Sequence, residues 1–155
     1  MIDPAEILGR LTAVDPGISQ EAYYGERSLF YNPGRARPLG VIFASIKDRD
    51  GPNDKAANLS RPGVYRFAFG VTRETYAAIF GAVPARPPKG EAVALRGHDL
   101  TAIDELTPHP VYAWMSWVQI LSPTQARFES LQPLLDEALE LARTRWRRGL
   151  TRIVR

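Results

Sequence analysis

The most polar stretch of the chain, residues 47–61, combines short amides, carboxylates and basic side chains. Basic groups supply charge and amides supply directional hydrogen bonds, so this composition suits an anionic ligand, either a small molecule or a nucleic-acid segment. A long polar loop on a small domain is often a binding element. We therefore predict a ligand site made by this loop and one face of a sheet. Its residues are Lys47, Arg49, Asn53, Lys55, Asn58, Arg61 and Arg66, with Tyr112 or Trp114 as an aromatic wall.

Two other interpretations of the same segment have to be weighed. Asn, Asp, Gly and Pro also stabilise ordered turns through hydrogen bonds to the backbone, so the loop can be purely structural. A calcium loop of the EF-hand kind starting at Asp48 needs glycine at its sixth position and glutamate at its twelfth, where this chain has Asn53 and Leu59. The calcium interpretation is therefore rejected, and the structural one stays open.

The two histidines of the chain, His98 and His109, are the next candidates for chemistry. With Asp99, Asp104 and Glu105 they offer ligand types suited to zinc or iron, but the histidines stand eleven positions apart and match no metal-binding pattern. We therefore predict no metal and no cofactor. In an alternative hypothesis a small enzyme uses His109 as acid or base in the same cleft. A pure protein-interaction subunit is a third possibility.

Basic charge is concentrated at the C-terminal end of the chain. The first 142 residues hold 14 basic and 17 acidic side chains, whereas residues 143–155 hold six arginines and no acid. Arginines interleaved with a tryptophan can hold phosphates and stack a base, which makes nucleic acid a candidate partner. The residues concerned are Arg143, Arg145, Trp146, Arg147 and Arg148. The alternative is a solvated helix end capped by Gly149, with cations that complement the helix dipole.

Hydrophobic patterns and turn residues predict the elements that must position these side chains. A first short helix begins after Asp3, a second runs from its cap Thr72 to Gly81, and helical structure resumes from Ser122 with a break at Pro133. The run at 108–123 is apolar on both faces, as expected for a central strand. The predicted strands are 23–31, 39–48, 64–69, 91–95 and 108–123, the first two joined as a hairpin.

Length and composition bound the class of protein. With 155 residues, 45% hydrophobic and 24% charged, the chain can form a single globular domain, 1–155, that ends in the basic segment 143–155. It has no cysteine, no signal peptide and no apolar run of membrane-spanning length, so we predict a cytoplasmic protein without membrane contact. The order of its elements predicts an α+β fold: a two-layer sandwich, mainly an antiparallel sheet with helices packed on one face.

Longer phrases of the sequence carry a resemblance. The chain resembles an uncharacterised bacterial family among the domains of unknown function, of the 6194 type, which implies relatives and no activity. The phrases are Leu29-Phe-Tyr-Asn-Pro-Gly34, residues 43–54, Asn58-Leu-Ser-Arg-Pro-Gly-Val-Tyr-Arg-Phe67 and Pro108-His-Pro-Val-Tyr-Ala-Trp-Met-Ser-Trp117. A fainter likeness, in the aromatic run and residues 134–142, is to the MmcQ/YjbR-like proteins, small α+β domains for which nucleic-acid binding has been suggested.

Overall fold

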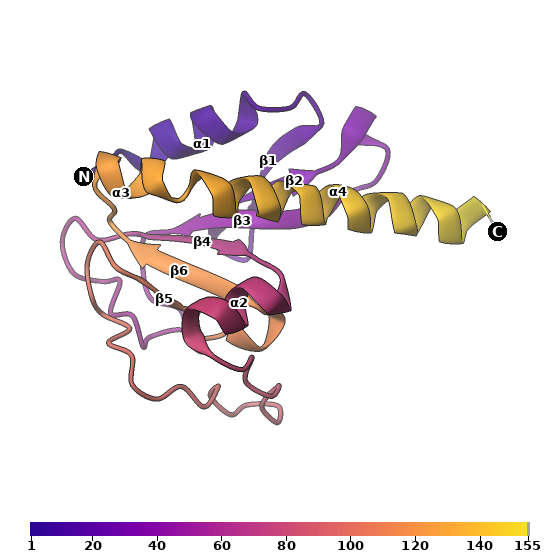
Figure 1. Cartoon of the computed structure of the whole chain (residues 1–155). Helices are drawn as coiled ribbons and strands as arrows, with labels where there is room; N and C mark the ends of the chain where they lie inside the picture. The colour runs from indigo at the N-terminus through magenta and orange to yellow at the C-terminus, as the bar shows by residue number, and fades with distance from the viewer. Residues whose placement is uncertain (155) are drawn as a thin grey trace.

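An antiparallel sheet organises the structure, a computed structural model that describes residues 1–154 and the side chains as far as residue 149. Within these residues six strands pair in the order β1-β2-β3-β4-β6-β5 (Figure 1). The strands are β1 (Ile18–Tyr23), β2 (Glu26–Tyr31), β3 (Val41–Lys47), β4 (Arg66–Gly70), β5 (Leu106–Pro108) and β6 (Trp117–Leu121). The helices are α1 (Pro4–Thr12), α2 (Arg73–Phe80), α3 (Gln125–Ser130) and α4 (Gln132–Val154), with short 3-10 turns η1 (Pro33–Arg35) and η2 (Ala113–Met115). The predicted α+β fold is confirmed.

One face of the sheet is covered by α1, α3 and α4 (Figure 1). Apolar residues recur along α4 at helical spacing and are buried, which gives the helix the continuous stripe it packs with. In the sheet, Phe67 lies on this face, with its ring 5.9 Å from that of Phe128 on α3. The buried stripe of α4 consists of Leu135, Ala138, Leu139, Ala142 and Trp146.

The opposite face carries a row of small and polar side chains. Ser28, Ser45, Ala68, Gln119 and Thr107 are paired in this order across the strands and therefore share one face. All of them are buried: residues of the segment 109–115 line a cavity together with Ser28 and Ser45, and the Leu100 carbonyl accepts a hydrogen bond from Gln119. We call this the loop-covered face. Small side chains on this face leave space beneath the loops. On the helix-covered face, the corresponding space is filled by phenylalanine and leucine side chains.

The prediction of a single strand over the aromatic run 108–123 is wrong. Pro108 ends β5, residues 109–116 turn through η2, and Trp117–Leu121 forms β6. Ser116, at the end of that turn, has a φ of 64°, a left-handed conformation that no extended strand contains. A packed turn needs buried residues on both sides, just as a central strand does, so its apolar pattern resembles that of a strand.

Other boundaries also differ from the prediction. Residues 23–31 include a tight turn, since Tyr24 and Gly25 both have positive φ and join β1 to β2, a geometry typical of two-residue hairpins. Residues 91–95 form no strand. Gly149 does not end α4, which continues to Val154. A Cβ on Gly149 would lie only 2.6 Å from the Arg37 guanidinium, so close approach explains this glycine.

Several local predictions are confirmed. The hydroxyl of Thr72 accepts a hydrogen bond from the Thr75 amide and caps α2, and Gly81 follows its last residue. The Asp3 carboxylate accepts from the Ala5 amide at the start of α1. Strands β2 and β3 pair as the predicted hairpin. In the described part of the chain, every helix is too short or too polar to cross a membrane.

Candidate functional site

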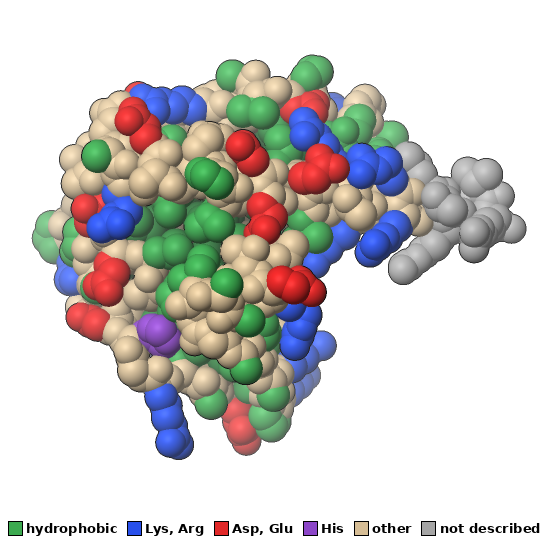
Figure 2. Space-filling model, in the orientation of Figure 1, with side chains coloured by type: hydrophobic (Ala, Val, Ile, Leu, Met, Phe, Trp, Pro, Cys, Tyr) green, Lys and Arg blue, Asp and Glu red, His purple; other side chains and the backbone are tan. Residues whose placement is uncertain are grey.

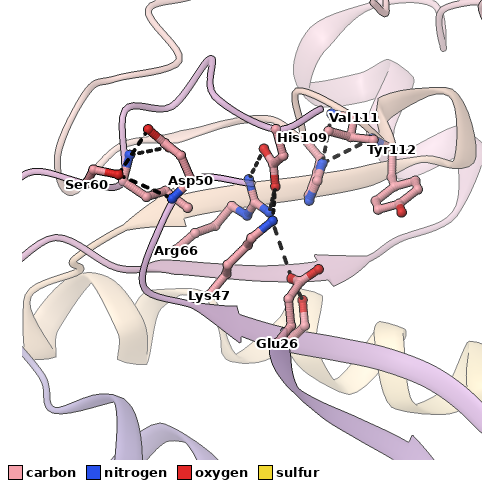
Figure 3. A network of polar contacts seen from close by, with 11 residues as sticks. Glu26, Lys47, Asp50, Ser60, Arg66, His109, Val111 and Tyr112 are labelled. Atoms are coloured by element: carbon pink, nitrogen blue, oxygen red, sulfur yellow. Dashed lines mark hydrogen bonds and ion pairs between the residues drawn. The ribbon is translucent and has the colours of Figure 1, made fainter. Parts of the chain in front are cut away.

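A cluster of charges lies at one end of the loop-covered face (Figure 3). The Arg66 side chain on β4 is 1% exposed, and its guanidinium donates to both carboxylate oxygens of Asp54, with N···O distances of 2.9 and 2.5 Å. Lys47, at the end of β3, donates to the same carboxylate at 2.9 Å. Glu26 of β2 lies 3.8 Å from Arg66. Two cations are thus matched by two carboxylates, so the cluster carries no net charge.

The ionisation of Asp54 follows from this arrangement. Burial alone would raise the pKa of Asp54, but hydrogen bonds and charge from Arg66, followed by those from Lys47, outweigh it and hold the pKa well below the ordinary value of 3.8. The carboxylate therefore stays charged and fastens residues 51–54 to the sheet. Lys47 and Arg66, both predicted ligand residues, direct their charge at Asp54.

His109 follows β5 and is buried beside this cluster. Its Nδ1 accepts hydrogen bonds from the Val111 and Tyr112 amides, both at 3.0 Å. These donors require a free lone pair on Nδ1, so the ring proton is assigned to Nε2. Burial and the Arg66 charge lower the pKa of His109 well below 6.5, with Asp54 opposing and Lys47 adding to the shift. His109 is therefore a neutral imidazole that can donate one hydrogen bond through Nε2.

An inner cavity of about 250 Å³ opens beside this imidazole. Ser28 lines it with a hydroxyl that is buried and has no hydrogen-bond partner in the described residues, and Ser45 lines it while donating to Glu26 at 3.1 Å. Burial, then the nearby carboxylates of Glu26 and Asp54, raise the pKa of Tyr112, so its phenol also stays neutral. The remaining walls are mainly aromatic and apolar: Tyr23, Tyr24, Ile42, Met115 and Trp117.

A larger hollow, the outer groove, lies on the other side of residues 53–54. Its volume is about 730 Å³, and its walls include the predicted residues Asn53, Lys55 and Trp114. Arg86 places its guanidinium 4.5 Å from the centre of the Trp114 ring. A smaller hollow of about 370 Å³ lies between the two, since it shares Tyr112 with the inner cavity and Asn53 with the outer groove.

The remaining predicted ligand residues have structural contacts. Arg61 donates to the carbonyl oxygens of Asn58, Ala57 and Thr101, at 2.8, 3.1 and 2.9 Å. Asn58 itself has a φ of 52°, which suits a turn. Arg49 is exposed and pairs with its neighbour Asp48 at 3.3 Å. The described walls of the inner cavity and outer groove do not include Arg49, Asn58 or Arg61.

Comparison with known proteins places the chain in a family. It matches a family described as DUF6194, a family of unknown function, over residues 2–151. The chain belongs to this family. No curated protein and no solved structure gives a significant match, and the expected likeness to the MmcQ/YjbR-like proteins is not supported. Because DUF6194 brings no activity with it, the chemistry of the site has to be argued from its geometry.

Sequence patterns missed several residues of the site in this DUF6194 protein. Glu26, Ser28 and Ser45 lie within strands. The sequence pattern does not identify them as site residues, because the polar segment 47–61 is the strongest signal for a ligand site. A signal did exist: Ser45 is a small polar residue inside the otherwise apolar run 41–46, and Ser28 directly precedes the apolar residues 29–31. Their pairing across β2 and β3 gives the cavity its floor.

The basic C-terminal segment of the DUF6194 chain is divided between the body and the surface. Trp146 is 5% exposed, with the Arg37 guanidinium 3.8 Å above its ring and the Tyr31 ring at 6.2 Å. Arg143 is paired with Asp15 at 2.6 Å, and Arg147 lies 3.3 Å from Glu140. The tryptophan therefore belongs to the core and is not presented to a nucleic-acid base. Arg152 and Arg155 lie outside the residues whose side chains are described.

The residues whose types would suit zinc or iron are dispersed in the fold. His98 contacts the edge of the Phe80 ring at 5.3 Å, Asp99 accepts from Thr101, and Asp104 accepts from the Thr124 amide at the start of α3. In the described part of the chain, histidine and acidic side chains form no group of three suited to a metal ion.

Proposed function

We propose that this DUF6194 protein is a binding module for a small organic anion, held on the loop-covered face. The ligand's uncharged ring would enter the inner cavity, and its anionic group would remain toward the outer groove. The observation that carries the proposal is the Ser28 hydroxyl in the cavity wall, which is buried and has no hydrogen-bond partner in the described residues, beside His109, whose Nδ1 is occupied so that Nε2–H is the donor that remains. Buried polar groups are normally hydrogen-bonded, so an occupant that satisfies both groups would stabilise the site.

The walls of the inner cavity define the part of the ligand that fits there. Rings of Tyr23, Tyr112 and Trp117 favour a planar or apolar group, and the neutral donors favour an uncharged oxygen such as a hydroxyl or carbonyl. A carboxylate is disfavoured in this cavity, because Glu26 lines it and the charges of Lys47 and Arg66 are directed at Asp54.

The outer groove supplies the positive charge that an anionic group needs. Lys55, Arg86 and Lys89 line it, together with Glu91 and the already paired Asp54. Its cations therefore exceed its uncompensated acids. Of the basic residues predicted from sequence, Lys55 is the one that lines the outer groove and can contact the anionic group.

The geometry of His109 bears on the alternative of an enzyme. A general base must accept a proton, but Nδ1 already accepts two amide hydrogens and Nε2 carries the ring proton. Its lowered pKa also leaves no imidazolium to act as a strong acid near neutral pH. A hydrogen-bond donor to a bound oxygen is the role that fits His109 best. Acid–base catalysis would require the turn at residues 109–112 to rearrange.

The test compares two probes on the intact chain by NMR titration of backbone amides: phenol, which is uncharged, and hydroxyphenylpropionate, which adds a carboxylate. Both should shift the amides of Ser28 and Tyr112, and the carboxylate should bind more tightly. Lys55→Ala should remove that advantage and leave phenol binding unchanged. Ser28→Val should weaken both probes.

Arg49→Ala is the matched control, because it removes a cation of the same loop that lies outside the cavity walls. It should leave both affinities unchanged, and melting temperatures should show that every variant is folded. The proposal is overturned if neither probe shifts the cavity amides at millimolar concentration. It is equally overturned if Arg49→Ala and Lys55→Ala have the same effect.

A further inference from the structure

We infer that this protein has a second ligand site, which binds a phosphate-bearing small molecule between α2 and α4. The site is a hollow of about 520 Å³ that we call the arginine hollow. Arg73 lies at the start of α2. Arg145 and Arg148 lie on the last turns of α4 whose side chains are described. Its other walls are Val71, Thr72, Glu74, Met115, Ser116 and Leu141.

The charge of this hollow is only partly compensated by the described residues. Among the described residues, no carboxylate lies within ion-pair distance of Arg73, Arg145 or Arg148, whereas Arg143, on the same helix, is paired with Asp15 at 2.6 Å. Glu74 is the acid that the walls of the hollow contain. An excess of positive charge therefore faces a concave surface, where it attracts anions.

A second acid lies beside the hollow and is engaged by the start of α2. Glu137 of α4 accepts hydrogen bonds from the Thr72 amide at 3.2 Å and from the Thr75 hydroxyl at 2.6 Å. Its carboxylate thus satisfies the start of α2 and is held there by both contacts. The arginines are left for a ligand from solution.

The side chains of the hollow indicate the ligand's chemical class. Guanidinium groups match the oxygens of a phosphate through paired hydrogen bonds, and more than one arginine suits its double charge. Val71, Met115 and Leu141 add an apolar surface for an organic group, and Ser116 adds a hydroxyl, while the hydroxyl of Thr72 is already hydrogen-bonded to Thr75. A phosphate monoester with a small organic part fits these walls.

Nucleic acid fits this place less well. A base-stacking surface is missing among the described walls of the hollow, because the Trp146 ring packs against Arg37 and Tyr31. Figure 2 shows basic side chains along this side of the molecule interrupted by acidic ones, where α4 projects past the body. A backbone of many phosphates would meet several of those acids, whereas a single phosphate group would meet Glu74 alone among the described walls of the hollow.

The experiment titrates the intact chain with phenyl phosphate and, separately, with inorganic phosphate, using isothermal calorimetry and amide NMR. Phenyl phosphate should bind more tightly and should shift the amides of Thr72 and Ser116. Arg145→Gln or Arg148→Gln should weaken it by about tenfold, a loss of roughly 1.4 kcal/mol for each guanidinium contact.

Arg147→Gln is the matched control, because it removes one charge from the same helix at a position that faces Glu140 and not the hollow. It should change the affinity for phenyl phosphate by less than about twofold, a small change in free energy. Equal effects of Arg147→Gln and Arg145→Gln would overturn the inference. So would tighter binding of a duplex DNA oligonucleotide that depends on the same arginines. Met115 is shared with the inner cavity, but the variants lie outside it, so the two proposals fail independently.

Discussion

At the scale of single residues, Asp54 determines how the charges of the candidate site are used. Its carboxylate lies between Arg66 and Lys47 and leaves neither cation unpaired in a buried environment. Removing one partner of a buried ion pair is costly, because the remaining charge has lost water without gaining a counter-charge. Sequence identified both cations as ligand contacts, although their geometry is that of a clamp holding the loop to the sheet.

Asp54→Asn should therefore destabilise the protein by about 3–5 kcal/mol near neutral pH. A carboxylate with a lowered folded pKa contributes stability that is fully present above its unfolded value of 3.8 and is lost as pH falls toward the folded pKa. Below pH 4 the stability of the variant should accordingly decrease less steeply with falling pH than the stability of the wild type. Urea unfolding from pH 3 to pH 7 measures both effects. An unchanged stability at neutral pH would show that the clamp is absent.

His109 should produce a pH dependence in a different range. Its folded pKa is lowered, so the unfolded chain binds a proton at 6.5 that the folded chain resists. Stability should fall by up to about 1.4 kcal/mol per pH unit as the pH drops below 6.5. His109→Gln should flatten this slope between pH 5 and pH 6.5, and His98→Gln should retain it. Equal slopes in wild type and His109→Gln would contradict the neutral, buried imidazole.

At the scale of elements, local sequence signals were sufficient to predict a helix or turn whose structure is decided within one short segment. Thr72 and Gly81 bound α2 through a side-chain cap and a positive φ, and both features are visible in the sequence. The strand prediction for 108–123 was wrong because the turn depends on hydrogen bonds from backbone amides to Nδ1 of His109. A pattern of apolar residues gives no sign of these hydrogen bonds. The pairing of Asp54 with Arg66 could not be predicted from the sequence for a similar reason, since it joins a loop to a strand.

Attachment of α2 to α4 provides a test at this scale. Glu137 satisfies two donors at the start of α2, so Glu137→Ala should destabilise the protein by about 1–2 kcal/mol. Thr75→Val should also be destabilising, because it removes one of the contacts of Glu137 and the acceptor of the Thr72 hydroxyl. In a double-mutant cycle measured by urea unfolding, the two losses should be less than additive. Full additivity would mean that the side chains do not interact.

At the scale of the whole molecule, packing is divided between the two faces of the sheet. Helices fill one face with large apolar side chains, while loops close the other over serines and a buried arginine. The first face stabilises the fold, and the second leaves the space in which the candidate site lies. α4 connects distant parts, because it contacts β3, reaches Arg37 near η1 and carries the glutamate that caps α2.

The basic segment 143–155 should therefore behave as part of this framework. Deleting it removes Trp146 from the core and the Arg143 partner of Asp15, so the shortened chain should lose at least about 3–5 kcal/mol of stability. An appended nucleic-acid arm would instead be removable without loss of stability. Urea unfolding of residues 1–142 distinguishes these outcomes, with Arg145→Gln as a control that lowers the charge and keeps the core. A deletion variant as stable as the intact chain would show that Trp146 contributes nothing to the core and would restore the segment as a candidate arm.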